Sequence, residues 1–278
     1  MLSASTDPSR VAMRRSAAGS TRLLRTAPIA LGVLVAIAVF APILTPYASD
    51  ALDLAHRRAS PSFAHLFGTD ELGRDLLTRV MFGARVSLSV GLISAFLSIA
   101  IGTAVGAVAG YARGWADDVL MRATDAMLCI PRLPFLMMLA AIVHPTVPAL
   151  VLLIGLVNWM ETARVVRTAV QSVAAREFVS AARASGASAT RVLMRHVLPG
   201  ALPAITVAST LAVGRGILLE SALSFFGVGV QPPVPSWGNM LYQAQSTMTS
   251  EPWLALFPGL MIFATVLACN AIGDVVAR

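Results

Sequence analysis

Residues 87–109 read SLSVGLISAFLSIAIGTAVGAVA, a run of 23 residues without a charged side chain. As a helix this run would be about 35 Å long, enough to cross a hydrocarbon core about 30 Å thick. A helix pairs all of its own backbone N–H and C=O groups, which lipid cannot do for it. The stretch therefore predicts a membrane-spanning helix.

The composition of the whole chain also indicates a protein solvated by lipid. Of the 278 residues, 56% are hydrophobic and 13% are charged. A soluble domain carries about 25% charged residues. So few charged side chains cannot cover a globular surface, and the composition argues against a soluble protein.

Five further apolar runs have lengths that favour spanning helices. The fourth span is the weakest, because only 14 of its residues precede the charge of Glu161. The first exceeds the roughly 7–15 apolar residues of a signal peptide, so we expect an uncleaved anchor. The expected fold is all-α, a polytopic membrane protein with about six transmembrane helices. The expected spans are residues 27–44, 87–109, 126–143, 147–160, 202–226 and 253–272.

The placement of arginine predicts the orientation of the spans. With a cytoplasmic amino terminus, 14 arginines fall on the inner side and five on the outer side, as the positive-inside rule requires. We therefore expect both termini in the cytoplasm, with residues 1–25 as a mobile tail and residues 26–278 as the transmembrane domain. Residues 47–85 and 227–252 would be outer segments, and residues 161–199 the long inner segment.

The basic residues exclude several catalytic and nucleotide-binding motifs. All 21 residues counted as Lys or Arg are arginine, so the chain has no G-x-x-x-x-G-K-[ST] loop and no Schiff-base lysine. H-E-x-x-H and G-x-S-x-G patterns are missing, and Cys129 and Cys269 lie in apolar runs. We expect no catalytic residue, no metal site and no cofactor bound by this chain. Any ATP it depends on must be hydrolysed by another polypeptide.

Ionisable side chains inside the expected spans are costly and either pair with other groups or line a solute path. Asp125 and Arg132 are seven residues apart in the third span, on one face and about 10 Å apart axially, and Pro131 interrupts that span. Arg215 and Glu220 lie roughly 140° apart around the fifth span, so each needs a partner elsewhere. The candidate path residues are Asp125, Arg132, Arg215 and Glu220, with Glu220 preferred because it lies near the outer end of its span.

Small residues recur every fourth position in the second span and share one helix face. The missing side chains let another backbone approach closely, which indicates either packing within the chain or a dimer seam or moving joint. The five residues are Ser94, Ser98, Gly102, Gly106 and Gly110.

The inner segment before the fifth span contains a short helix with a smooth face. Phe178, Ala181, Ala182 and Ser185 recur at i, i+3, i+4 and i+7, and Gly186 fits the residue that ends a helix. Such a face suits docking of a soluble partner. The alternative is an ordinary basic inner loop.

A second short helix is expected after the first. Ser188 can cap its start, and Arg191 and Arg195 would share a face. Leu198 and Pro199 would then begin the fifth span.

The same segment, EFVSAARASG at 177–186 through HVLP at 196–199, resembles the coupling-loop signature of membrane subunits of binding-protein-dependent ABC importers. The family pattern is E-A-A, three residues, G, nine residues, I-x-L-P. This chain has Ser180 in place of the Glu, which removes any salt bridge from that Glu to the ATPase, and His196 in place of the Ile. The resemblance implies an ATPase-coupling site formed by Ser180, Ala181, Ala182, Gly186, Leu198 and Pro199.

Further blocks at matching spacing resemble the dipeptide, oligopeptide and nickel class of these importers, and the resemblance covers about residues 26–274. The G-T-D-x-L-G-R-D block is typical of the C-type permease subunit, which pairs with a different, B-type subunit. The family usually continues beyond Asp274 with a longer tail, so docking contacts made by that tail would be missing. The blocks are residues 68–75, 83–88, 110–125, 163–167 and 219–238.

The resemblance implies a permease subunit in the bacterial inner membrane that forms half of the path for small peptides. It implies a coupling helix between the fourth and fifth spans, within about residues 168–199. The implied partners are a B-type permease, two cytoplasmic ATPase subunits or domains that use ATP and Mg, an external solute-binding protein and membrane lipid, with no nucleic acid. ATPase closure would move the coupling helix and open the cavity outward.

Other solutes and other classes stay open on sequence grounds. Nickel chelates, glutathione and haem are alternative solutes, because in this family specificity lies largely with the external binding protein. A secondary transporter would carry coupling-ion carboxylates near the midplane and often an internal repeat, which we do not find. An intramembrane enzyme would need nucleophile, base or metal-ligand patterns that the sequence lacks.

Overall fold

The computed structural model describes the backbone of residues 8–143 and 146–277, and the side chains of these residues from Thr26 onward. Within these ranges the protein is all-α, without a β-strand, and one isolated bridge joins Thr69 and Asp75. The long helices are α1 (Pro8–Leu44), α2 (Leu76–Ala112), α3 (Gly114–Leu128), α4 (Arg132–Val143), α5 (Val147–Ala174), α8 (Leu198–Phe225) and α10 (Trp253–Val276). The short ones are η1 (Leu54–His56), α6 (Glu177–Ala184), α7 (Ala189–Val192), the π-helix η2 (Leu193–Val197), α9 (Trp237–Ala244) and η3 (Gln245–Thr247).

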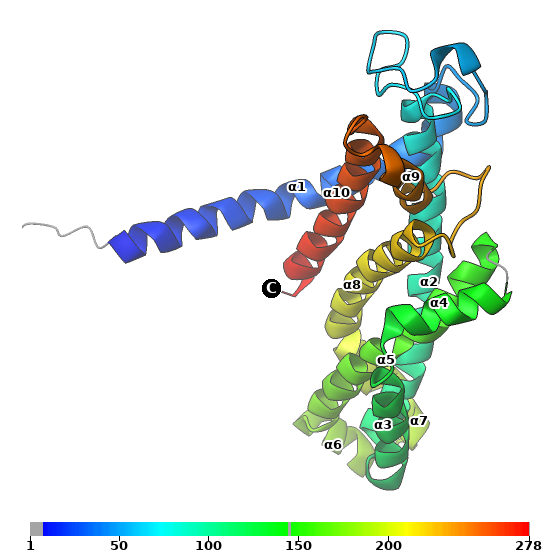
Figure 1. The fold of residues 1–278 in the computed structure, drawn as a ribbon. Helices are drawn as coiled ribbons and strands as arrows, with labels where there is room; N and C mark the ends of the chain where they lie inside the picture. Colours follow the sequence, from blue (N-terminus) through cyan, green and yellow to red (C-terminus); the bar gives the residue numbers. More distant parts are fainter. Residues whose placement is uncertain (1–7, 144–145, 278) are drawn as a thin grey trace, which may run out of the picture.

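Helix α2 forms the long axis of the molecule (Figure 1). With 37 residues it is about 55 Å long, more than the thickness of a hydrocarbon core. The first of the two expected outer segments, residues 47–85 (below called the outer segment), lies at its first end, and α3, α6 and α7 lie at its other end (Figure 1). Helices α5 and α8 pack along α2, and α10 packs on α8 and α1.

The small-residue face of α2 packs against α5 within the chain, as one of the two alternatives predicted. A Cβ added at Gly102 would lie 2.7 Å from the Trp159 carbonyl oxygen, and one at Gly110 would lie 2.6 Å from that of Arg167. Real Cβ atoms do not come this close, so the two backbones meet only because side chains are missing.

The structure divides the third expected span into two helices. Helices α3 and α4 are bent by 81° at the break between Leu128 and Arg132, where Pro131 lies. Within the described residues, five helices are long and apolar enough to cross a membrane, or six if the bent pair counts as one span. The expected count therefore holds only when the broken pair is included.

Two helices extend beyond the expected boundaries. Helix α5 has 28 residues and continues past Glu161 to Ala174, whereas the fourth span was expected to end at residue 160. The charge of Glu161 is paired with arginines of two other helices and does not interrupt the helix. Residues 8–25, expected as a tail, continue helix α1, since Ala, Arg and Leu readily extend a helix already formed.

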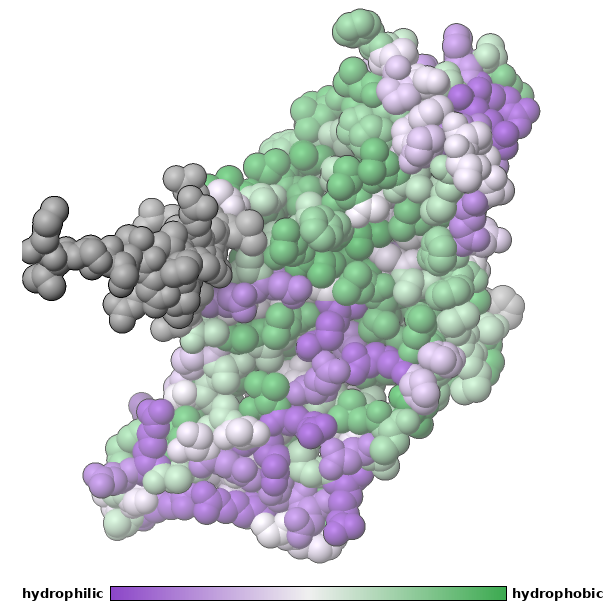
Figure 2. Space-filling view, turned by 60° about the vertical axis from the view of Figure 1, so that its left-hand side comes forward, coloured by the Kyte–Doolittle hydropathy of each residue, from purple (hydrophilic) through white to green (hydrophobic). Residues whose placement is uncertain are grey.

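The surface has the polarity of a membrane protein. Figure 2 shows hydrophilic surface at the two ends of the molecule and mainly hydrophobic surface between them, with a hydrophilic strip part of the way along. Large apolar side chains on the long helices are open, for example Phe96 at 73% and Phe263 at 64% exposed. Such side chains are stable when lipid or another membrane subunit covers them.

Candidate functional site

One buried valine holds α6 on the ends of the long helices. Val179 has no exposed surface and packs in a cluster with Val170 and Val173 of α5 and with Val192 and Val197 of the segment that follows α6. Full burial of one such side chain stabilises the fold by about 1.5–3 kcal/mol. Helix α6 is thus fixed to α5 and to the approach to α8.

Helix α6 ends at Gly186, as predicted. Gly186 has φ +81°, its N–H donates to the Arg183 carbonyl at 3.0 Å, and the Ala187 N–H donates to the Ala182 carbonyl at 3.2 Å. This pair of bonds is the Schellman motif. Ser188 precedes α7 as predicted, but its side chain makes no capping hydrogen bond.

A π-helical turn joins α7 to α8. The Leu198 N–H donates to the Leu193 carbonyl, five residues back. Pro199 has no N–H to continue the regular α-helical ladder here. Leu198 and Pro199 form the first turn of α8, as predicted.

The outward face of α6 is open. Phe178 is 47% exposed. Ser180, Ala181 and Ser185 are exposed as well, and Ala182 is half-buried. One aromatic ring among small side chains allows the backbone of a partner to come close. We call this face, formed by Phe178, Ser180, Ala181, Ala182 and Ser185, the α6 docking face.

A group of charged residues at the middle of α5 joins three helices. Glu161 of α5 accepts a hydrogen bond from Arg132 of α4 (Nη2–Oε1, 2.6 Å) and pairs with Arg215 of α8 (Nη1–Oε2, 3.0 Å). Glu161 is near the middle of α5, about 20 Å from either end. We call these three residues the charged triad.

A cavity of about 210 Å³ lies beside the triad. Arg132 and Glu161 form its polar wall, and the break between α3 and α4 contributes Met127, Ile130 and Pro131. The side chains of Arg132, Glu161 and Arg215 keep 24%, 40% and 28% of their surface exposed. The triad is therefore open to a solute or to another subunit.

Of the four predicted path residues, the structure brings Arg132 and Arg215 together through Glu161. Sequence reasoning missed Glu161 because the residue was taken as the end of a span. The signal was present, since two arginines at membrane depth require an acidic partner there.

Asp125 and Arg132 do not share a helix face, because α3 ends before Arg132 begins α4. Asp125 lies 3.9 Å from Arg164 (Oδ1–Nη1), and both side chains are 60% exposed. An ion pair as exposed as this one contributes at most about 1 kcal/mol to the stability of the fold. Asp125 is thus separate from the triad.

Glu220 is fully buried, which contradicts its preferred role as a path-lining residue. Its two carboxylate oxygens accept hydrogen bonds from Ser87 and Ser224, each at 2.8 Å. Ser87 also accepts the backbone N–H of Trp237 at 3.2 Å. Glu220 therefore joins α2, α8 and the start of α9 in this conformation and meets no open space.

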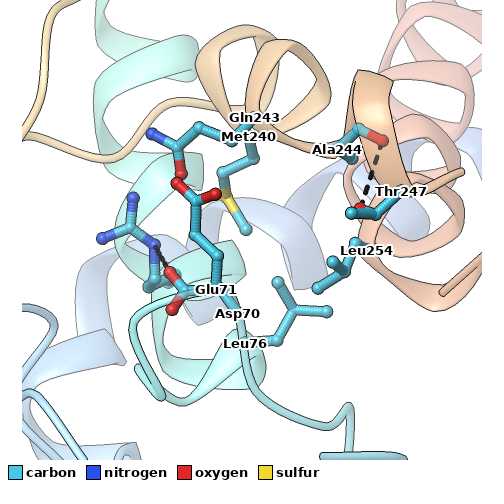
Figure 3. Close-up of a pocket in the computed structure, with 9 residues that line it drawn as sticks. Asp70, Glu71, Leu76, Met240, Gln243, Ala244, Thr247 and Leu254 are labelled. Atoms are coloured by element: carbon cyan, nitrogen blue, oxygen red, sulfur yellow. Dashed lines mark hydrogen bonds and ion pairs between the residues drawn. The ribbon is translucent and has the colours of Figure 1, made fainter. Parts of the chain in front are cut away.

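The outer segment is tied to the helices around a small pocket of about 20 Å³ (Figure 3). Asp70 accepts the Arg74 Nε–H at 2.6 Å and pairs with the buried Arg79 at 3.5 Å. Gln243 of α9 accepts from Arg74 at 3.3 Å. This volume suits one water molecule, so the pocket is a structural joint and no solute site.

A larger cavity of about 450 Å³ lies within the outer segment. The Nδ1 of His56 donates to the Asp53 carboxylate at 2.8 Å, and the Nδ1 of His65 donates to that of Asp75 at 3.0 Å. The hydrogen bond from His56 lowers the pKa of the Asp53 carboxyl. Asp75 also caps α2 by accepting the Thr78 N–H at 2.8 Å, so these groups organise the loop.

Comparison with known families and proteins gives a consistent result. The family model described as "Binding-protein-dependent transport system inner membrane component" matches residues 102–278. A Brucella suis biovar 1 protein that carries the name of a peptide permease is 42% identical over 235 residues, which are 84% of this chain and 78% of that protein. A glutathione transport system permease protein of Escherichia coli is 39% identical over 250 residues, which are 90% of this chain and 82% of that protein.

The fold is similar to that of a solved membrane transporter. The inward-facing structure of the MetNI methionine ABC transporter has a chain that superposes with a TM-score of 0.58 at 18% identity. The match covers 73% of this chain and 98% of that one. At this identity the likeness shows the fold alone.

Proposed function

Since the chain belongs to the family of binding-protein-dependent transport system inner membrane components and is the permease of an ABC importer, we propose that it forms half of a translocation path for small peptides. Relatives named as a peptide permease and a glutathione permease support this solute class. Glutathione is itself a modified tripeptide. Nickel chelates and haem stay the alternatives that the solute measurement below would reveal.

The observation that carries the proposal is the α6 docking face. Phe178 and Ala181 are open, while Val179 on the other side of the same helix is fully buried. A force applied to this face would pass through the valine cluster to α5 and α8, the helices that carry Glu161 and Arg215 of the charged triad. Coupling needs contacts that differ between two states, and a rigidly mounted face can supply them.

The proposed assembly has four further components. We propose a second permease subunit of the B type, two cytoplasmic ATPase subunits or domains that bind ATP and Mg, and an external protein that delivers the solute. The α6 docking face would receive one of the ATPases, and in that arrangement both termini of this chain would be cytoplasmic. No cofactor is assigned to this chain itself.

Ala181→Trp tests the docking face. In the complete importer reconstituted in liposomes, we expect stimulation of ATP hydrolysis by solute-loaded binding protein to fall to near the basal rate, because the indole keeps the ATPase away from α6. Ala181 is exposed, so the fold should tolerate the change. Ala55→Trp in the outer segment, also exposed, is the matched control and should keep full stimulation.

Unchanged stimulation in Ala181→Trp would remove the docking assignment. The solute class is tested separately, by native mass spectrometry of the ligand that co-purifies with the external binding protein. A nickel chelate or haem in place of a peptide would overturn the solute class and leave the docking assignment intact.

A further inference from the structure

The charged triad carries an excess of positive charge. Two guanidinium groups, of Arg132 and Arg215, share the single carboxylate of Glu161. Arg164, on the same helix as Glu161, pairs with Asp125, and that pair is neutral. One cationic charge is thus left over at the depth where a helix is surrounded by the membrane core.

The open side of the triad cannot face lipid. A charged side chain at the bilayer centre is costly and faces protein or water, and these three side chains are all partly exposed in this chain. Non-helical backbone at membrane depth is likewise tolerated only against protein or a water-filled cavity. Ile130 and Pro131 of the break line the same cavity as Arg132 and Glu161 of the triad, and Arg215 pairs with Glu161 beside it.

The donors of the triad are not exhausted by Glu161. A guanidinium has five N–H donors, and Glu161 has one contact with each arginine through a different oxygen. The Nε of Arg215 is buried and has no hydrogen-bond partner in the described part of the chain. The carboxylate of Glu161 already contacts two cations. The groups that still lack a partner are therefore N–H donors of the arginines, which carry positive charge.

We propose that the charged triad is a binding step of the translocation path that receives the free carboxylate of the transported solute. The proposal rests on the function proposed above and names the solute's recognised group. Arg132 and Arg215 provide the donors, and Glu161 holds the two arginines at one place and cancels half of their charge. Partial cancellation suits transport, since a path must bind its solute weakly enough to release it.

A pair of peptides that differ at one group tests this role. The complete importer in liposomes, supplied with saturating loaded binding protein, is given either a dipeptide or the same dipeptide with an amidated carboxyl end. The import rate of each peptide by a variant is divided by the wild-type rate for that peptide. Because the binding protein is the same in both, its own preference cancels.

Arg215→Gln is expected to lower import of the free-carboxylate peptide by about tenfold or more, the worth of a hydrogen bond to a charged group. Import of the amidated peptide should change less than twofold. Arg215→Lys keeps the charge and should retain most of the wild-type preference. Arg122→Gln, at an exposed position of α3, is the matched control and should leave both rates unchanged.

The outcomes separate the two proposals. Equal loss of both peptides in Arg215→Gln, with normal assembly of the complex, would overturn the carboxylate role alone. Failure of the wild-type importer to move either peptide would overturn the proposed function and the role together. If Arg215→Gln does not assemble, Arg132→Gln supplies the same comparison and must show the same selective loss.

Discussion

Single residues decide how α2, α8 and α9 are held together, and Glu220 is the clearest example. Its carboxylate joins hydroxyl groups from α2 and α8, and Ser224 in turn accepts the Val230 N–H at 3.0 Å. Trp237, fully buried beside them, donates its indole N–H to the Val80 carbonyl at 3.0 Å. A buried polar network of this kind fixes the position of α9 as long as every member is paired.

Glu220→Ala should lower the free energy of unfolding by about 2–3 kcal/mol, because it leaves the buried hydroxyl protons of Ser87 and Ser224 without their acceptor and opens a cavity between α2 and α8. Denaturant titration of the purified protein in detergent measures the change. Glu177→Ala, at the exposed start of α6, should cost less than about 1 kcal/mol. A loss as small in Glu220→Ala as in Glu177→Ala would show that the network does not hold α9.

A substitution at Gly186 would not be a clean test of docking. The space around it is open within 4 Å, but its φ of +81° strains any other residue. A bulky side chain there would change the end of α6 as well as any docking contact. Ala181, which has ordinary helical geometry, tests docking without that complication.

At the scale of elements, the contact between α2 and α5 is set by the small-residue stripe. A Cβ added at Gly106 would collide with the backbone carbonyl of Ala163 and lie 3.0 Å from the backbone nitrogen of Arg167. Backbone atoms cannot move aside as a flexible side chain can. The two helices would have to separate.

Gly106→Ala should therefore lower stability by about 1–3 kcal/mol, the usual cost of overpacking. Gly259→Ala in α10, where nothing lies within 4 Å of the added Cβ, is the matched control and should gain up to about 1 kcal/mol from helix propensity. Thermal unfolding of the two variants in the same detergent checks the difference. Equal stability would mean that α2 and α5 are not in close contact.

The end of α3 next to α5 is fixed by a different device. Arg167 donates two hydrogen bonds to Asp117, at 2.5 and 2.6 Å, and Gln171 adds one at 3.2 Å. A bidentate arginine–carboxylate pair is among the stronger polar contacts in proteins. It fixes the start of α3 to α5. The 81° bend therefore lies at the other end of a helix whose first turn is held in place.

At the scale of the whole molecule, the proposed orientation places the outer segment and the α6 docking face on opposite sides of the membrane. Figure 1 shows them at opposite ends of α2. In a variant with Cys129 and Cys269 replaced by serine, single cysteines at the exposed positions Ser60 and Ser188 test this. A membrane-impermeant thiol reagent should label Ser60→Cys in intact spheroplasts, and Ser188→Cys only after permeabilisation.

Labelling of Ser188→Cys from the outside would reverse the orientation and remove the α6 docking face from the cytoplasm. It would also contradict the distribution of arginine, which favours the proposed side by 14 to five. The α2–α5 packing and the triad would be unaffected, since neither depends on which end faces the cytoplasm.

The sequence alone determined the membrane class, most of the spans, the end of α6 at Gly186 and the start of α8 at Leu198 and Pro199. These follow from apolar run length and from the backbone limits of Gly and Pro, which are local properties. The tertiary structure decided which charges meet. Glu161 could be placed in mid-membrane only once α4 and α8 brought Arg132 and Arg215 to it, and Glu220 could be recognised as buried only once serines of two helices enclosed it. Pairing across helices depends on distances in space that no spacing along the chain contains.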